Sequence, residues 1–117
     1  MRLDCMVWGR NLVARPVGEL DLAVADRFRA ELEHYLSIGE VRNLVLNLSR
    51  VSFIDSSGLG VILGRYRYLR SLGGQVAIVR PSPPVNRLLE LAGLHRLMRF
   101  YNSEEEALGS LERGSGE

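Results

Sequence analysis

The hydrophobic residues of this 117-residue chain follow two spacings that alternate along its length. Short, nearly continuous apolar runs predict strands, and they cover residues 3–8, 11–17, 41–48, 75–79 and 97–101. Apolar residues at steps of three and four predict helices, which fill residues 21–37, 56–72, 82–92 and 103–111. The pattern therefore predicts an α/β fold, in which a mixed sheet of about five strands packs with four α-helices.

Turn and cap residues predict where several elements end. Gly9-Arg10 predicts an antiparallel hairpin between the first two strands. Pro16 cannot donate to a ladder, so we expect it near the end of its strand or on a sheet edge. Residues 18–21 should form a turn in which Asp21 caps the first helix, and residues 51–55 should lead into the second helix.

Composition limits the possibilities without naming a function. A hydrophobic fraction of 46% and a charged fraction of 25% predict one globular domain over residues 1–112, followed by a flexible tail over 113–117. The net charge of +1 gives no field that favours nucleic acid. No apolar run is long enough to span a membrane and the start lacks a signal peptide, so we expect a cytoplasmic protein. The single Cys5 should be a small buried residue of the first strand.

Residues 53–64 carry the most informative pattern, an apolar strand that runs through Asp55, Ser56 and Ser57 into an amphipathic helix. Asp and Ser are preferred helix caps because their oxygens accept the unpaired N–H groups of the first turn. The loop therefore presents serine hydroxyls at the positive end of a helix, where a phosphate is stabilised. The competing interpretation is a strand-to-helix turn that is merely well capped.

Three glycines stand in the first turns of this helix, at Gly58, Gly60 and Gly64. Each weakens a helix by about 1 kcal/mol relative to alanine. One explanation is close packing of the helix on the sheet. The other is a surface kept low so that another protein, or its bound nucleotide, can approach the serine; the sequence leaves both open.

The sequence lacks the residue patterns expected of a metal site or of a serine hydrolase. His34 and His95 stand far apart without cysteine neighbours, so we expect no metal site. No general base is expected near the serines, and Gly-x-Ser-x-Gly is absent. We therefore predict a protein that is not an enzyme and binds no cofactor. The alternative is a nucleotide-binding enzyme that uses the Ser-Ser-Gly-Leu-Gly run, and nucleotide titration would distinguish the two.

The segment from Asp55 to Tyr66 closely resembles the signature of anti-sigma factor antagonists, small proteins built on the STAS domain. Other segments agree in order and spacing, namely residues 18–21, 43–48, 82–85 and 91–94. The resemblance extends from about Val7 to Leu111 and is greatest to the sporulation branch of the family. It implies a mixed sheet with helices packed around it.

The resemblance also implies a function. The unphosphorylated form would bind an anti-sigma factor that is also a serine kinase carrying ATP or ADP, and binding would release the sigma factor. The kinase would then phosphorylate the first serine of the motif, Ser56, and a serine phosphatase would restore the active form. An antagonist in a general stress-response module is the alternative within the family. We expect a monomer when the protein is free.

The expected partner-binding residues surround this serine. They are Glu19, Asp21, Asp55, Ser56, Ser57, Gly58, Leu59, Gly60 and Arg65. Arg65 should lie on the solvent side of the second helix, whereas the spacing of Leu59 favours the core over an outward anchor. Leu22 and Ala23 depart from the family, where polar residues commonly follow Asp21.

Overall fold

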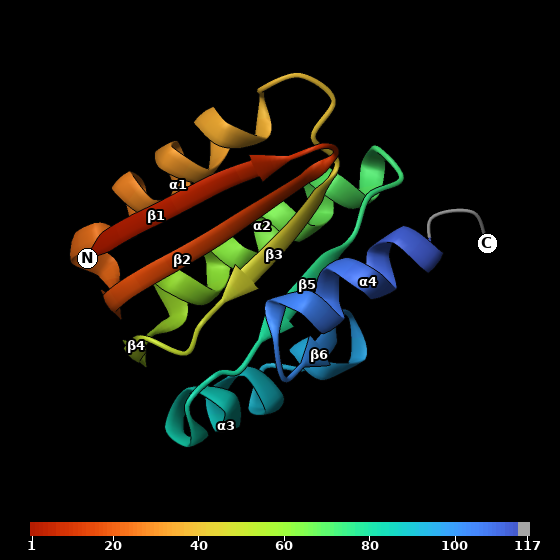
Figure 1. Ribbon diagram of the computed structural model, residues 1–117. Helices are drawn as coiled ribbons and strands as arrows, with labels where there is room; N and C mark the ends of the chain where they lie inside the picture. Colours follow the sequence, from red (N-terminus) through yellow and green to blue (C-terminus); the bar gives the residue numbers. More distant parts are fainter. Residues whose placement is uncertain (115–117) are drawn as a thin grey trace.

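The computed structural model describes residues 1–114 and shows the expected α/β fold (Figure 1). Its strands are β1 (Arg2–Trp8), β2 (Asn11–Leu20), β3 (Asn43–Asn47), β4 (Val51–Ile54), β5 (Val76–Val79) and β6 (Arg99–Tyr101). Its helices are α1 (Leu22–Leu36), α2 (Ser56–Ser71), α3 (Pro83–Leu91) and α4 (Glu104–Gly114), with a short 3-10 turn η1 (Leu94–Arg96). The described residues thus form four α-helices and six strands instead of about five, because the lead into α2 pairs as a strand of its own.

The strands form a mixed sheet in the order β1-β2-β3-β5-β6. β1 and β2 make the predicted antiparallel hairpin, whereas β2 pairs with β3, β3 with β5 and β5 with β6 in parallel. β2 also changes partner along its length. It pairs with β3 as far as Ala14 and then, from Gly18, with β4. The switch carries the end of β4 beside the end of β2, where the candidate site lies.

Two local expectations about β2 are wrong. The strand continues to Leu20, so residues 18–21 do not form the expected turn, and Pro16 is neither at the strand end nor on a sheet edge. Pro16 pairs with Leu3 of β1 and lies between the segments that pair with β3 and β4. Residue 16 therefore has a paired strand on the β1 side only, because β3 pairing ends at Ala14 and β4 pairing begins at Gly18. A proline, which has no N–H to donate, is acceptable at such a position even in a central strand.

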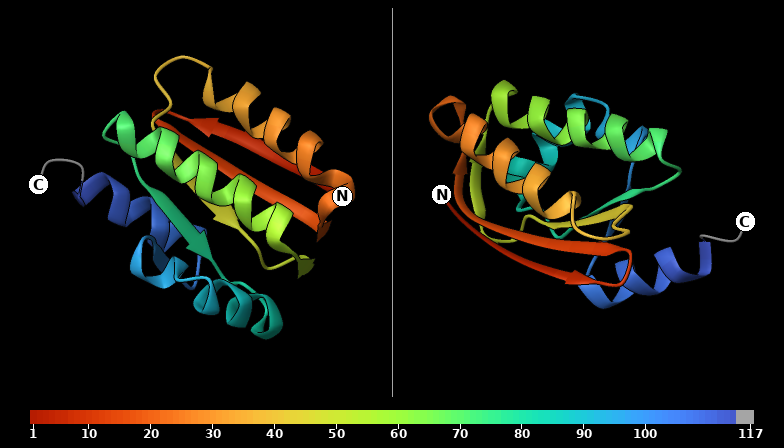
Figure 2. Two further views of the ribbon diagram at one scale, coloured as in Figure 1. Left: turned by 180° about the vertical axis from the view of Figure 1, so that it is seen from behind. Right: turned by 90° about the horizontal axis from the view of Figure 1, so that it is seen from above.

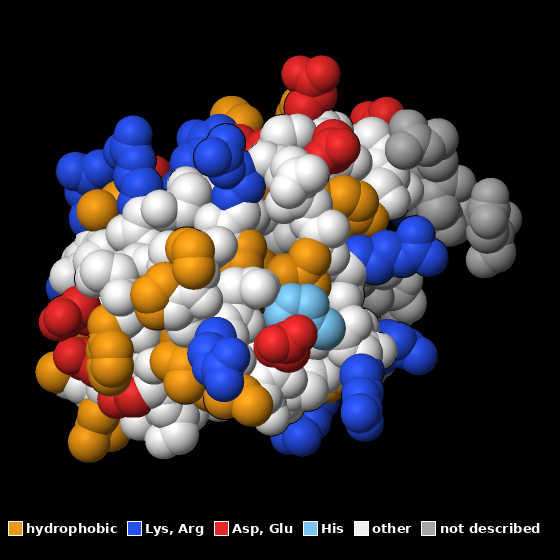
Figure 3. Space-filling model, turned by 90° about the horizontal axis from the view of Figure 1, so that it is seen from below, with side chains coloured by type: hydrophobic (Ala, Val, Ile, Leu, Met, Phe, Trp, Pro, Cys, Tyr) orange, Lys and Arg blue, Asp and Glu red, His pale blue; other side chains and the backbone are white. Residues whose placement is uncertain are grey.

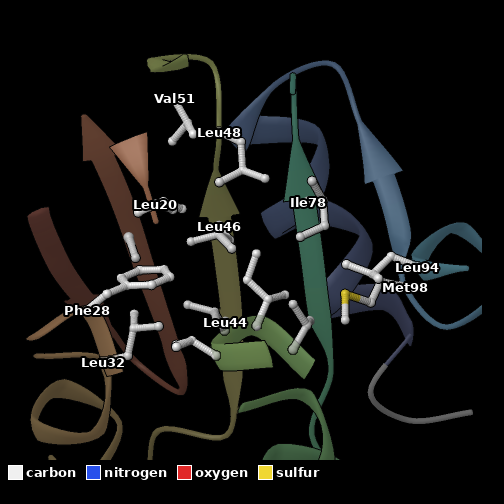
Figure 4. Packing of buried hydrophobic residues seen from close by; sticks show 14 of the residues in the cluster. Leu20, Phe28, Leu32, Leu44, Leu46, Leu48, Val51, Ile78, Leu94 and Met98 are labelled. Carbon is white, nitrogen blue, oxygen red and sulfur yellow. The ribbon is translucent and has the colours of Figure 1, made fainter. Parts of the chain in front are cut away.

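The helices cover the two faces of the sheet unequally (Figure 2). α1, α2 and α3 pack on one face, where Phe28 and Leu32 of α1 lie with Leu44 and Leu46 of β3 in the main core (Figure 4). α4 packs on the other face in a smaller cluster that contains Val45. Alternate residues of β3 thus enter opposite cores, which explains its nearly continuous apolar run.

A partly exposed hydrogen-bond network joins the start of α4 to β2 and β3. Arg15 donates two hydrogen bonds of 2.7 Å to the carboxylate of Glu104, and Asn47 Nδ2 donates a third of 2.7 Å to the same group. These contacts lower the pKa of Glu104, chiefly through the Arg15 hydrogen bonds. Half of the predicted capping box is present: Ser103 Oγ accepts the N–H of Glu106 at 3.1 Å, whereas the Glu106 carboxylate accepts the N–H of Asn102 at 3.0 Å instead of that of Ser103.

The C-terminal end of the chain concerns the expected tail and the expected domain boundary. α4 continues to Gly114, and residues 115–117, most of the expected tail, lie outside the described residues. The domain boundary at residue 112 stays a prediction. In the described part of the chain, no helix combines the length and apolarity that crossing a bilayer requires.

Candidate functional site

Asp55 connects the two helices that begin at the candidate site, at the lower left of Figure 1. It follows β4, and its backbone N–H donates to the carbonyl of Leu20 at 3.3 Å. Its Oδ1 accepts the N–H groups of Ser57 at 2.8 Å and Gly58 at 3.2 Å, which caps α2 as predicted. Its Oδ2 accepts the N–H of Leu22, the first residue of α1, at 3.0 Å. One carboxylate therefore satisfies donors of two helix N-termini.

Asp21 occupies the N-cap position of α1, but its side chain makes no cap hydrogen bond. The expectation that Asp21 caps the helix through its side chain is wrong: the N–H of Val24 donates to the Asp21 backbone carbonyl at 3.1 Å, and the N–H of Leu22 donates to Asp55 of the neighbouring loop. Asp21 Oδ1 is instead buried without a hydrogen-bond partner among the described residues. Glu19, the other acidic residue predicted here, is exposed on β2.

Ser56 is the first residue of α2 and is exposed. Within residues 1–114 its hydroxyl makes no hydrogen bond, so the oxygen is open to an incoming group. Ser57 is half-buried. The N–H groups of Ser57 and Gly58 already donate to Asp55, so these first-turn donors are not available to cradle the phosphates of a free nucleotide.

The three glycines of α2 separate into two kinds. A Cβ on Gly58 would lie 2.3 Å from the carbonyl oxygen of Leu20 and 2.9 Å from Ile54 Cγ1, so close packing explains this glycine. A Cβ on Gly60 or Gly64 would meet no atom within 4 Å. The packing explanation therefore holds for Gly58 alone, and the low-surface explanation remains for the other two.

The sequence predicted the burial of one α2 side chain correctly and the exposure of another wrongly. Leu59 is partly buried against the core, as its spacing favoured. Arg65 does not lie on the solvent side as expected: its side chain is only 16% exposed and forms an ion pair of 3.0 Å with Glu33 of α1. Its guanidinium also lies 5.6 Å from the centre of the Tyr68 ring. The expectation failed because helical periodicity does not reveal that α1 packs alongside α2 (Figure 2).

Sequence reasoning missed the apolar side chains around Asp55. Leu22 is 75% exposed and Phe53 of β4 is 45% exposed. Leu91, at the C-terminal end of α3, is also exposed. Figure 3 views this end of the molecule, where hydrophobic side chains gather over the left half and centre, next to acidic ones. The available signal was that Leu22 falls outside the apolar spacing of its helix.

The hydrogen bond and ring contacts of the histidines are with side chains other than Ser56 and Asp55. His34 is exposed on α1, and His95 stacks on Phe100 at 3.8 Å between ring centres and contacts Asn86 Oδ1 at 3.0 Å. Across residues 1–114, no group of three His, Cys, Asp or Glu side chains is arranged to hold a metal ion. The candidate site is thus a surface of one exposed serine, a bridging aspartate and nearby apolar side chains.

Known proteins resemble this chain in both sequence and fold. The family model of the STAS domain matches residues 5–107. The anti-sigma F factor antagonist of Paenibacillus polymyxa is 42% identical over 101 residues, which are 86% of each chain. The structure of the anti-sigma factor antagonist SpoIIAA in its unphosphorylated form has a TM-score of 0.82 at 34% identity and covers 97% of both chains. The Bacillus cell fate determinant SpoIIAA in the phosphorylated form has a TM-score of 0.73 at 34% identity, over 92% of this chain and 97% of that one. This chain therefore belongs to the STAS-domain family and, within it, to the anti-sigma factor antagonists.

Proposed function

We propose that the unphosphorylated protein binds an anti-sigma factor that is also a serine kinase, and so releases a sigma factor. Phosphorylation of Ser56 by that kinase ends the interaction, and a serine phosphatase restores it. The observation that carries the proposal is the exposed, unengaged hydroxyl of Ser56 at the start of α2, within the signature of the family. The chain itself is the substrate of the kinase and not an enzyme.

Accessibility and local order both support Ser56 as the modified residue. A kinase needs a hydroxyl that can reach its bound ATP, and Ser56 is exposed whereas Ser57 is half-buried. The loop at Ser56 is held by the Asp55 carboxylate, which accepts the N–H of Ser57 and, from α1, the N–H of Leu22. The hydroxyl is thus presented from a fixed position, which lowers the entropic cost of placing it in a kinase site.

The effect of a phosphate at Ser56 follows from charge and space. Phosphorylation adds roughly −1.5 to −2 charges at neutral pH. The new group stands next to the Asp55 carboxylate, whose Oδ1 already uses the Ser57 and Gly58 N–H groups. A partner that carries nucleotide phosphates near the same loop is repelled by that charge. The fold need not change, a view supported by the likeness of this chain to SpoIIAA structures of both forms.

The apolar side chains around the serine supply attraction for the partner. Leu22 and Phe53 flank Asp55 on adjacent elements, and both are exposed. Apolar contacts surrounded by polar groups are the usual centre of a specific interface. The partner-binding set predicted from the sequence therefore gains Leu22 and Phe53, with Glu19 at the polar edge.

The identity of 42% to an anti-sigma F factor antagonist supports a role in sporulation over one in general stress. The organism of that relative is Paenibacillus polymyxa. We therefore assign the protein to a sporulation-type module, in which the anti-sigma factor is its direct partner.

Binding of the chain to a cognate anti-sigma factor kinase with ADP tests the proposal. Wild-type protein should bind, and Ser56→Asp should bind at least about tenfold more weakly while its thermal midpoint stays within about 2 °C. Ser71→Asp is the matched control, because it adds the same charge at the opposite end of α2, roughly 22 Å away by helical rise. Equal weakening by both variants, or unfolding of Ser56→Asp, would contradict a local switch.

A further inference from the structure

Two arginines stand where the parallel strands end, at the same end of the sheet as Ser56. Arg50 lies in the turn between β3 and β4, and Arg80 directly follows β5. Two hydrogen bonds, of 2.9 Å and 3.4 Å, join residues 48–51 to residues 79–82, so the two arginines stand on neighbouring segments. In α/β proteins, the carboxyl ends of parallel strands are the usual place for groups that bind other molecules.

Neither arginine has a carboxylate partner in the part of the chain that the structure describes. The ion pairs of residues 1–114 engage five other arginines, namely Arg2, Arg15, Arg27, Arg29 and Arg65. Arg50 and Arg80 are both exposed. Figure 3 views this end of the molecule, and arginine side chains gather at its upper left. Unpaired positive charges on neighbouring segments favour a negative group that another molecule brings.

Arg80 is held in a backbone conformation that suits glycine better. Its φ is +47°, and no other non-glycine residue of the described chain has a positive φ. A side chain is strained in this left-handed region, whereas glycine adopts it freely. The Arg80 N–H donates to the carbonyl of Tyr101 at 3.1 Å, which helps to hold the backbone in place. Glycine would serve the fold better, which indicates that the arginine side chain has a use outside the fold.

A hollow of about 420 Å³ opens beside Arg50, where β2 leaves β3 to pair with β4. Two other charged residues, Asp4 and Arg15, also line this hollow. Asp4 pairs with Arg2 at 3.5 Å, and Arg15 pairs with Glu104 at 2.7 Å. Among the described residues that line the hollow, Arg50 therefore carries the charge that is left for an incoming group, and that group must be negative.

We infer that Arg50 and Arg80 bind acidic side chains of the anti-sigma partner, at the edge of the surface that surrounds Ser56. This inference rests on the proposed function. Arginine binds a carboxylate through two parallel hydrogen bonds, so two exposed arginines without internal partners fit acidic side chains. The nucleotide of the partner lies at the serine itself, and the negative groups that meet these arginines are protein carboxylates.

The distance from Ser56 is within the reach of one interface. β4 separates Arg50 from Asp55, and its four residues span roughly 13 Å. An interface of standard size covers about 800 Å² on each partner, which is a patch that reaches roughly 16 Å from its centre. A partner centred on Ser56 therefore also covers Arg50 and the neighbouring segment that carries Arg80.

Association kinetics with the kinase and ADP at two salt concentrations test the inference. Arg50→Ala and Arg80→Ala should each lower the association rate constant about threefold or more at about 50 mM salt, because charges at the edge of an interface steer the encounter. The loss should shrink below about 1.5-fold at about 500 mM salt, which screens these charges. Arg10→Ala is the matched control. It removes the same charge from the β1–β2 hairpin at the opposite end of the sheet, and should change the rate constant less than about 1.5-fold.

Arg80→Gly separates the role of the side chain from that of the backbone. Its thermal midpoint should equal or exceed that of wild type, because glycine adopts a φ of +47° without strain. Its association rate constant should nevertheless fall as in Arg80→Ala. Wild-type rates in Arg50→Ala and Arg80→Gly, or losses that are equal at both salt concentrations, would overturn the inference and leave the proposed function intact. Failure of the wild-type chain to bind the kinase at all would instead overturn the proposed function.

Discussion

Asp55 Oδ2 accepts the backbone N–H of Leu22 at 3.0 Å, while Oδ1 of the same carboxylate caps α2. The two helices that surround Ser56 therefore share one anchor. Because both oxygens are engaged, the loop that presents the serine is fixed by α1 as well as by its own helix. The position of Leu22, the exposed apolar side chain nearest this anchor along α1, is fixed by the same bond.

Removing the shared anchor should cost more stability than removing Asp21. We expect Asp55→Ala to lower the free energy of unfolding by about 2 kcal/mol, since an N-cap is worth about 0.5–2 kcal/mol and this one serves two helices. Asp21→Ala should cost less than about 0.5 kcal/mol, because the Asp21 side chain makes no cap bond and buries an unpaired oxygen. Urea denaturation measures both. Equal losses would show that Asp21 carries the cap in solution.

Alanine at two neighbouring glycines should change stability in opposite directions. Gly60→Ala should raise the free energy of unfolding by up to about 1 kcal/mol through helix propensity, because its Cβ meets no atom. Gly58→Ala should lower it by about 1–3 kcal/mol, since its Cβ would lie 2.3 Å from the Leu20 carbonyl oxygen. Thermal unfolding of the two variants beside wild type gives the signs. Destabilisation by Gly60→Ala would mean that the surface of α2 is more crowded than the structure indicates.

The Arg15–Glu104 contact should make stability depend on pH in the acid range. The pKa of Glu104 lies below its ordinary value of 4.5, so the contact contributes fully above pH 4.5 and is lost as pH falls through the lowered pKa. A double-mutant cycle with Arg15→Ala and Glu104→Ala should give a coupling of about 1 kcal/mol at pH 7, because the pair is bidentate but partly exposed. The coupling should shrink towards pH 2. A coupling independent of pH would exclude the ion pair as its source.

Cys5 should react slowly with thiol reagents. Burial, with smaller contributions from Glu31 and Asp4, raises the pKa of its thiol to about 12. The reactive thiolate is therefore scarce at pH 8, and the half-buried sulfur is also shielded. A chromogenic disulfide reagent should label the native protein at least about a hundredfold more slowly than the urea-unfolded chain. Similar rates for the two forms would show that β1 opens readily.

Local patterns predicted most elements of this fold, because each depends on residues close in sequence. The steps of three and four around Phe28 and the Ser103 cap before Glu104 both correspond to helices in the structure. Contacts between distant segments were not predictable in this way. The change of partner along β2 is one, since it alone makes Pro16 acceptable in a central strand.

In the candidate site, too, local features were predictable and contacts between distant segments were not. The Asp55 cap on α2 followed from residues two and three positions away, whereas its bond to Leu22 joins positions 33 apart and carries no local signal. The burial of Arg65 likewise depends on Glu33 of another helix. The exposure of Leu22 could have been suspected from its place outside the apolar stripe of α1.

The most direct test of the account is the intact mass of the protein after incubation with a cognate anti-sigma factor kinase and ATP. Wild type should gain one phosphate, and Ser56→Ala should gain none, with Ser57→Ala as the matched control that is still modified. A phosphate that persists in Ser56→Ala, or an unmodified wild type in the presence of an active kinase, would contradict the assignment of Ser56 as the switch.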